Sequence, residues 1–246
     1  MFDLLSTAEL TASAAIFVFF LSSMLSSSVR QRALVAASLT GWFSLVLLAG
    51  ATGALAGPTA IGVPGVGLAV LIPIVVLSLL VLGTGRGRDL VRRTPLASLV
   101  GVHSVRVLGI SFVLLYWAKR LPAPFALAAG WGDVAVGVLA MPLALWLTRD
   151  AGAVPRGLVG MWNALGVLDL VIAVGLGTTS SPGPLRLFHG EPSSAIMTTV
   201  PWVLIPAFLV PSMIFVHLCT FYRLRMLAPA KGSERLHSVR VAAPSL

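Results

Sequence analysis

Five ionisable side chains lie inside stretches of this sequence that are otherwise apolar. They are His103, Arg106, Asp133, Asp169 and His217. On insertion scales, a charged side chain at the centre of a lipid bilayer costs about 2.5–3.5 kcal/mol. Each of these residues is therefore expected either to pair with another inside a helical bundle or to carry out the protein's function.

Arg106, Asp133 and Asp169 predict a cluster of one guanidinium and two carboxylates. Counting about 1.5 Å per residue along the expected helices places all three near the middle of the bilayer. Arg106 can pair with one carboxylate, so the second must take a proton, share the arginine or hold a cation. The cluster is then either a site that binds and relays a proton, a cation or a small anionic solute, or a structural clamp between helices.

Small residues share a helix face with the first aspartate. Gly130 and Gly137 lie three and four residues from Asp133, so the backbone of a neighbouring helix can approach this carboxylate closely. Trp131 is a candidate wall of the site or an anchor at the membrane surface. We therefore predict that Asp133 points into a seam between helices.

The second aspartate has a similar setting. Trp162 and Gly166 precede Asp169 by seven and three residues and share its helix face. Asn163 directly follows Trp162 and lies nearer the cytoplasmic end of the same span. We predict that Trp162 and Asn163 bind a substrate or ion together with the arginine and the two aspartates.

His103 and His217 form a second candidate site. Depth counting places both nearer the cytoplasm than the arginine cluster, with His217 close to the inner surface. Two imidazoles from two helices can hold a haem b as axial ligands or, with an aspartate, a metal ion. The sequence has no His-x-x-His pair and no carboxylate cluster beside the histidines that would strengthen a metal site. A third interpretation is that the two histidines accept protons or hydrogen bonds near the inner mouth.

Long apolar segments must position these residues. Hydrophobic residues make up 57% of the chain and charged residues 10%, whereas soluble domains carry about 25% charged residues. Seven stretches have the roughly 20 residues that a helix needs to cross a bilayer. We therefore predict an all-α fold, a polytopic membrane protein built as a bundle of seven transmembrane helices. The predicted spans are Glu9–Ser28, Ala33–Gly57, Ile61–Gly83, Leu96–Ala118, Phe125–Leu147, Gly157–Gly177 and Met197–Tyr222.

The distribution of basic residues predicts that the N-terminus is outside and the C-terminus is cytoplasmic. In this orientation thirteen of the seventeen Lys and Arg residues fall on the inner side, three fall on the outer side, and Arg106 is inside a span. We predict a single membrane domain at residues 1–222 and a basic, disordered tail at 223–246 that contacts anionic lipid rather than nucleic acid. The expected location is a bacterial-type inner (plasma) membrane.

Two other segments bear on access to the site. The longest outer connection, Thr178–Ala195, is either a lid over the outer mouth or a solvated linker. Pro201, Pro206 and Pro211 recur every five residues in the last predicted span. They predict either a static kink or a hinge that opens the inner end of the helix.

The sequence excludes several chemistries but leaves open whether the protein is an enzyme. No lysine lies inside a predicted span, which excludes a retinal Schiff base. The motifs of serine hydrolases, zinc proteases and nucleotide hydrolases do not occur. The leading hypothesis is transport or permeation through the arginine cluster. One alternative is a membrane redox enzyme or haem-binding protein with His103 and His217 as axial ligands, and another is a non-catalytic membrane assembly subunit.

Overall fold

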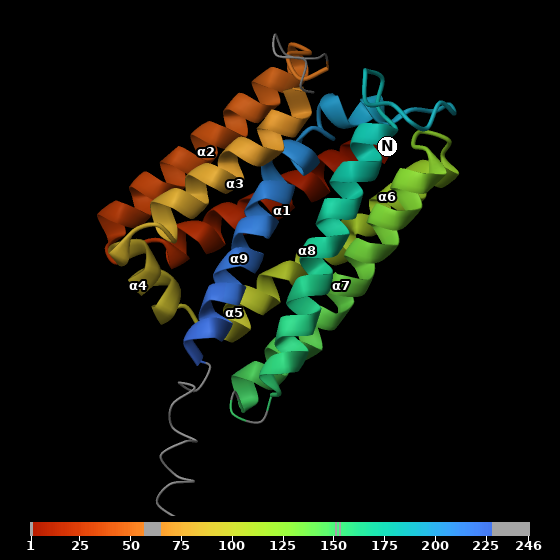
Figure 1. Cartoon of the computed structure of the whole chain (residues 1–246). Coiled ribbons are helices and arrows are strands. Elements are labelled where there is room, and N and C mark those ends of the chain that lie inside the picture. Colours follow the sequence, from red (N-terminus) through yellow and green to blue (C-terminus); the bar gives the residue numbers. More distant parts are fainter. Residues whose placement is uncertain (1, 57–64, 151, 153, 228–246) are drawn as a thin grey trace, which may run out of the picture.

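The described part of the chain is a bundle of helices (Figure 1). This computed structural model describes residues 2–56, 65–150, 152 and 154–227. Within these residues, six helices are long and apolar enough to cross a membrane, and a bent pair of helices makes a seventh if it counts as one span. The prediction of an all-α fold is confirmed for the described residues, and six or seven segments are long and apolar enough to cross a membrane.

Four predicted spans correspond to single helices whose ends differ by a few residues from the prediction. The turn between the first two shows why, because Ser28 accepts a hydrogen bond from the Gln31 N–H at 3.2 Å and so begins a helix earlier than predicted. The predicted end of the second span, Gly57, and the predicted start of the third, Ile61, lie outside the described residues. The four helices are α1 (Phe2–Met24), α2 (Val29–Ala51), α7 (Ala123–Arg149) and α8 (Arg156–Thr179).

The third predicted span corresponds to a shorter helix, after which the chain bends sharply into a second short helix. Helix α3 covers Gly65–Val81, α4 covers Gly85–Arg93, and the two meet at 93°. Thr84 separates them, since its side-chain oxygen accepts a hydrogen bond from the Gly87 N–H at 3.1 Å and begins the new helix. The arginines predicted to follow this span on the inner side therefore lie on a short helix of their own.

The fourth span changes its helical geometry in the middle. Helix α5 (Leu96–Gly101) leads into the 3₁₀ segment η1 (Val102–Gly109), and η1 leads into α6 (Ile110–Trp117). A 3₁₀ helix has about three residues per turn, so side chains three positions apart lie almost directly above one another. His103 and Arg106 are such a pair, and η1 presents both on the same side.

The last predicted span, Met197–Tyr222, is wrong in its first part. Pro201 and Pro206 each lack a backbone N–H and resist a regular helix, and the continuous span begins only at Ile205. The first residues of the predicted tail belong to this helix, while residues 228–246 lie outside the described part. The elements here are the 3₁₀ turn η2 (Ser194–Thr198), the π-helical segment η3 (Ile205–Leu209) and α9 (Val210–Leu227).

The last span, Ile205–Leu227, consists of η3 and α9 and is the most deeply buried of the long apolar helices in the described residues. It packs against α8 and α5 on one side and against α3 on the other. Helix α7 packs against α8 and against all three parts of the fourth span. The fourth span, α7, α8 and α9 thus meet around a common interior, and in Figure 1 the start of α1 and the end of α9 lie at opposite ends of the bundle.

Reporter fusions can decide between six and seven spans. Five crossings separate Ala56 from Leu227 if α3 crosses the membrane, and four if it does not. We expect a periplasmic reporter to be active after Ala56 and a cytoplasmic reporter after Leu227, as the positive-inside rule predicts. Activity of the same reporter at both positions would show that α3 does not cross.

Candidate functional site

The Arg106 side chain is buried and holds both aspartates. Its Nε donates to Oδ1 of Asp133 at 2.6 Å, and its Nη2 donates to Oδ2 of Asp169. The arginine side chain is 0% exposed, whereas the two aspartate side chains are 15% and 13% exposed. Arg106 is thus shared between carboxylates from α7 and α8, which was one of the options left open by the sequence.

The other guanidinium nitrogen binds groups on two further elements. Nη1 of Arg106 donates to the carbonyl oxygen of Gly166 at 3.2 Å and approaches Nε2 of His217 at 3.1 Å. Because a guanidinium only donates hydrogen bonds, Nε2 of His217 must be the acceptor and its proton must lie on Nδ1. Nδ1 of His217 then donates to Oδ1 of Asn163 at 2.8 Å, and Nδ2 of Asn163 donates to the His217 carbonyl oxygen at 3.1 Å. The partners of His217 therefore select a neutral imidazole.

His103 stacks on this imidazole. The two rings lie 3.9 Å apart between centroids with an angle of 21°, and Trp162 meets both rings at 5.6 Å. The indole of Trp162 donates to the carbonyl oxygen of Val136 at 3.2 Å, and this bond fixes the indole ring beside the two imidazoles. Neither ring nitrogen of the fully buried His103 has a hydrogen-bond partner in the described residues. His103 therefore contributes a buried imidazole with unused hydrogen-bonding capacity beside Arg106.

Glycines make room for the buried arginine. A Cβ added to Gly137 would lie 2.5 Å from the backbone nitrogen of Val107, and one added to Gly166 would lie 2.5 Å from Cε1 of His217. A Cβ on Gly132 would collide with the Asp169 carboxylate. The close approach predicted for the seams beside the aspartates is thus present on both α7 and α8.

The structure joins the two sites that were predicted separately. Depth counting placed His217 close to the inner surface because it assumed a helix from Met197. The span starts at Ile205 instead, so His217 is near its middle and reaches Arg106. The residues predicted for the two sites therefore contact one another and form one group, the arginine network: His103, Arg106, Asp133, Trp162, Asn163, Asp169 and His217. Trp131, the other candidate for a wall of the site, is 52% exposed.

The two histidines do not fit the axial positions of a haem. Axial imidazoles bind iron from opposite sides through one nitrogen each, but here the rings stack face to face and Nε2 of His217 is occupied by Arg106. The alternative of a single metal ion lacks a ligand set as well, since no group of three or more His, Cys, Asp or Glu side chains in the described chain is arranged to hold a metal. As they are arranged here, the described residues do not fit a haem or a single metal ion.

Glu9 is a half-buried carboxylate that was not predicted to belong to the polar set. It lies inside α1 rather than at its edge, and both of its oxygens accept from the hydroxyl of Ser111 at 2.9 and 2.7 Å. The first span was predicted to begin at Glu9, and a carboxylate at the boundary of a span needs no partner. Glu9 was therefore not recognised as a polar residue inside a helix. Its position on α1 facing α6 is separate from the arginine network.

The two aspartates border different cavities. Asp133 lines a pocket between α3, α7, α8 and η3, and Asp169 lines a groove between α7 and α8 together with Gly132 and Trp162. Arg106 lies between them and contacts both. A change of charge on one carboxylate must therefore alter the hydrogen bonding of the other.

Comparisons with known proteins give a family but no activity. A family model described as Domain of unknown function (DUF8737) matches residues 63–225. This range contains α3 and every residue of the arginine network. No curated protein and no solved structure matches the chain.

Proposed function

The chain belongs to the family Domain of unknown function (DUF8737), and we propose its function from the site itself: Arg106, Asp133 and Asp169 bind and relay a proton or a monovalent cation across the membrane. The observation that carries this proposal is the ratio of charges. Two carboxylates share one guanidinium, and the adjoining His217 is held as a neutral ring. If both carboxylates are ionised, the cluster has a net charge of −1. Burial makes it favourable for a proton or a cation to neutralise this charge.

The geometry favours a cation over an anionic solute. An anion would have to displace at least one aspartate from Arg106, and the displaced carboxylate would then be left without its partner at bilayer depth. A proton or cation instead completes the charge balance without breaking either ion pair. We therefore restrict the original hypothesis, which included small anions, to cationic substrates.

The neighbouring side chains support movement of charge rather than a fixed clamp. Both aspartate side chains remain partly exposed beside the cavities that they line, at 15% and 13%, so a proton or cation can reach them. His103 adds a buried acceptor beside the network whose nitrogens are unused in the described residues. These features fit the behaviour of ionisable residues on proton pathways in membranes.

Proton flux into vesicles tests the proposal. Purified protein in proteoliposomes with an internal pH dye should conduct protons when a potassium gradient and valinomycin set the membrane potential. We expect Asp133→Asn and Asp169→Asn each to reduce this flux to the level of protein-free vesicles, because each removes the excess negative charge. Asp89→Asn removes an exposed carboxylate on α4 and should leave the flux unchanged.

Two outcomes would contradict the proposal. Wild-type vesicles that conduct no more protons or alkali cations than empty ones would exclude relay by this cluster. Flux that both aspartate variants retain, in proteins with wild-type melting temperatures, would make the cluster structural and favour the assembly-subunit hypothesis.

A further inference from the structure

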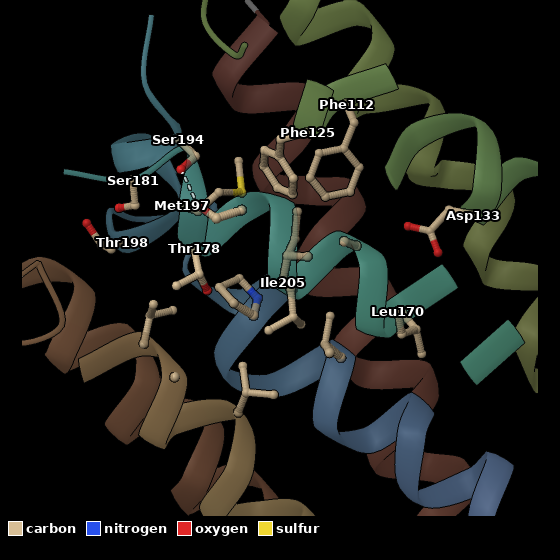
Figure 2. A pocket seen from close by; sticks show the side chains of 18 residues that line it. Phe112, Phe125, Asp133, Leu170, Thr178, Ser181, Ser194, Met197, Thr198 and Ile205 are labelled. Carbon is tan, nitrogen blue, oxygen red and sulfur yellow. Dashed lines mark hydrogen bonds between the residues drawn. The ribbon is translucent and has the colours of Figure 1, made fainter. Parts of the chain in front are cut away.

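A mainly apolar pocket ends at the arginine network (Figure 2). Its empty volume is about 640 Å³, including the part open to solvent. In Figure 2 the carboxylate of Asp133 lies at one end of the lining. Four hydroxyl side chains gather at the other end, namely Thr178, Ser181, Ser194 and Thr198. Asp133 is the only charged side chain among the described residues that line the pocket.

The pocket continues towards the loop after α8. A second cavity of about 420 Å³ lies beneath residues 181–185 and shares Thr178, Ser181 and Thr198 with the first. The N–H groups of Leu187 and Phe188 donate to the Thr179 carbonyl oxygen at 2.8 and 3.0 Å, so this loop folds back over the end of α8. The two cavities thus lie side by side, and the second extends under the loop after α8.

The Asp133 end combines a negative charge with aromatic walls. Phe112 and Phe125 meet edge to face with ring centroids 5.4 Å apart, and Leu170 lines the same pocket. Oδ1 of Asp133 accepts the bond from Arg106, while Oδ2 accepts none from the described residues. One carboxylate oxygen is therefore free for a donor that arrives through the pocket.

These walls discriminate between kinds of ligand. A bare inorganic cation needs several oxygen ligands, and here the hydroxyls lie at the far end from the carboxylate. A neutral apolar molecule would bury the negative charge without compensating it. An organic cation avoids both costs, because its charge pairs with the carboxylate and its apolar body contacts the aromatic rings, whose faces also attract cations.

We propose that this pocket binds a small organic ammonium ion, which donates a hydrogen bond to Oδ2 of Asp133 and packs its apolar body against Phe112 and Phe125. The inference assigns a substrate class to the proposed function and rests on it for the excess negative charge of the cluster. The enclosed part of the pocket has room for only a few water molecules, so the ligand is a short-chain amine.

Binding of n-butylammonium to the full-length protein in detergent tests the inference. Calorimetric titration should show saturable binding of n-butylammonium and none of 1-butanol, which has the same apolar body without the charge. Sodium chloride at equal ionic strength should not compete. Since this series uses only wild-type protein, its result does not depend on the folding of a variant.

Substitutions then locate the site. Asp133→Asn should weaken n-butylammonium binding by about tenfold or more, the change expected for a lost charged partner. Ala173→Phe, which adds a ring inside the pocket, should weaken it to a similar extent. Leu139→Phe adds the same ring to a 56% exposed position in the groove on α7 and should leave binding unchanged.

The results separate this inference from the proposed function. Equal binding of n-butylammonium and 1-butanol, or binding that Asp133→Asn and Ala173→Phe do not weaken, would overturn the ammonium site even if proton flux is observed. Selective, Asp133-dependent binding in a protein that conducts no cation would keep the site and overturn the relay.

Discussion

Replacement of Arg106 by methionine should lower the free energy of unfolding of the detergent-solubilised protein by about 3–5 kcal/mol, the usual cost of removing one member of a buried ion pair. The arginine side chain is fully buried and binds two carboxylates, a carbonyl oxygen and an imidazole from α7, α8 and α9. Methionine fills a similar volume but leaves all four groups without their donor. Thermal and denaturant unfolding followed by circular dichroism measure the change.

The arginine prediction has an internal test. Adding Asp133→Asn and Asp169→Asn to Arg106→Met removes the uncompensated charges, so the triple variant should recover a large part of the lost stability. Arg32→Met on α2 changes an exposed arginine in the same way and should alter stability little. If Arg106→Met unfolds at the wild-type temperature, the guanidinium does not hold these helices together.

The sequence was sufficient to group the arginine with its two aspartates. Charges at bilayer depth require partners, and simple counting along apolar helices gave Arg106, Asp133 and Asp169 a common level. Their contacts agree with that grouping. Glycine spacing likewise indicated which helix faces meet, since a Cβ on Gly137 or Gly166 would lie 2.5 Å from an atom of a neighbouring element.

Local departures from ideal helices account for what the sequence did not reveal. The prolines delay the start of the last span to Ile205, which moves His217 from the predicted surface to the network. The 3₁₀ segment η1 aligns His103 with Arg106 more closely than an α-helix would. The prolines indicate that the last span departs from a regular helix but not where it begins. Hydrophobicity contains no signal for the 3₁₀ segment, because this change depends on how the backbone packs against neighbouring helices.

Gly166 offers a second large effect, from a single added methyl group. Its Cβ would lie 2.5 Å from Cε1 and 2.8 Å from Nε2 of His217, and 3.3 Å from Nη1 of Arg106. An imidazole held by Asn163 on one side and Arg106 on the other cannot move away without breaking a hydrogen bond. We therefore expect Gly166→Ala to destabilise the protein by about 1–3 kcal/mol, as overpacking does in well-packed interiors, although alanine favours helix more than glycine.

Gly175→Ala on the same helix isolates the effect of packing from that of helix propensity. A Cβ at Gly175 meets nothing within 4 Å, so this variant should keep or gain up to about 1 kcal/mol through the preference of alanine for helices. The difference between the two melting temperatures then reports the contact with His217 and Arg106 alone. Gly166→Ala should also be rescued in part by His217→Ala, which removes the ring that the methyl group strikes. Equal stability of the two glycine variants would mean that α8 does not pack closely against His217 and Arg106 at Gly166. The proposed packing around the shared guanidinium would then be wrong.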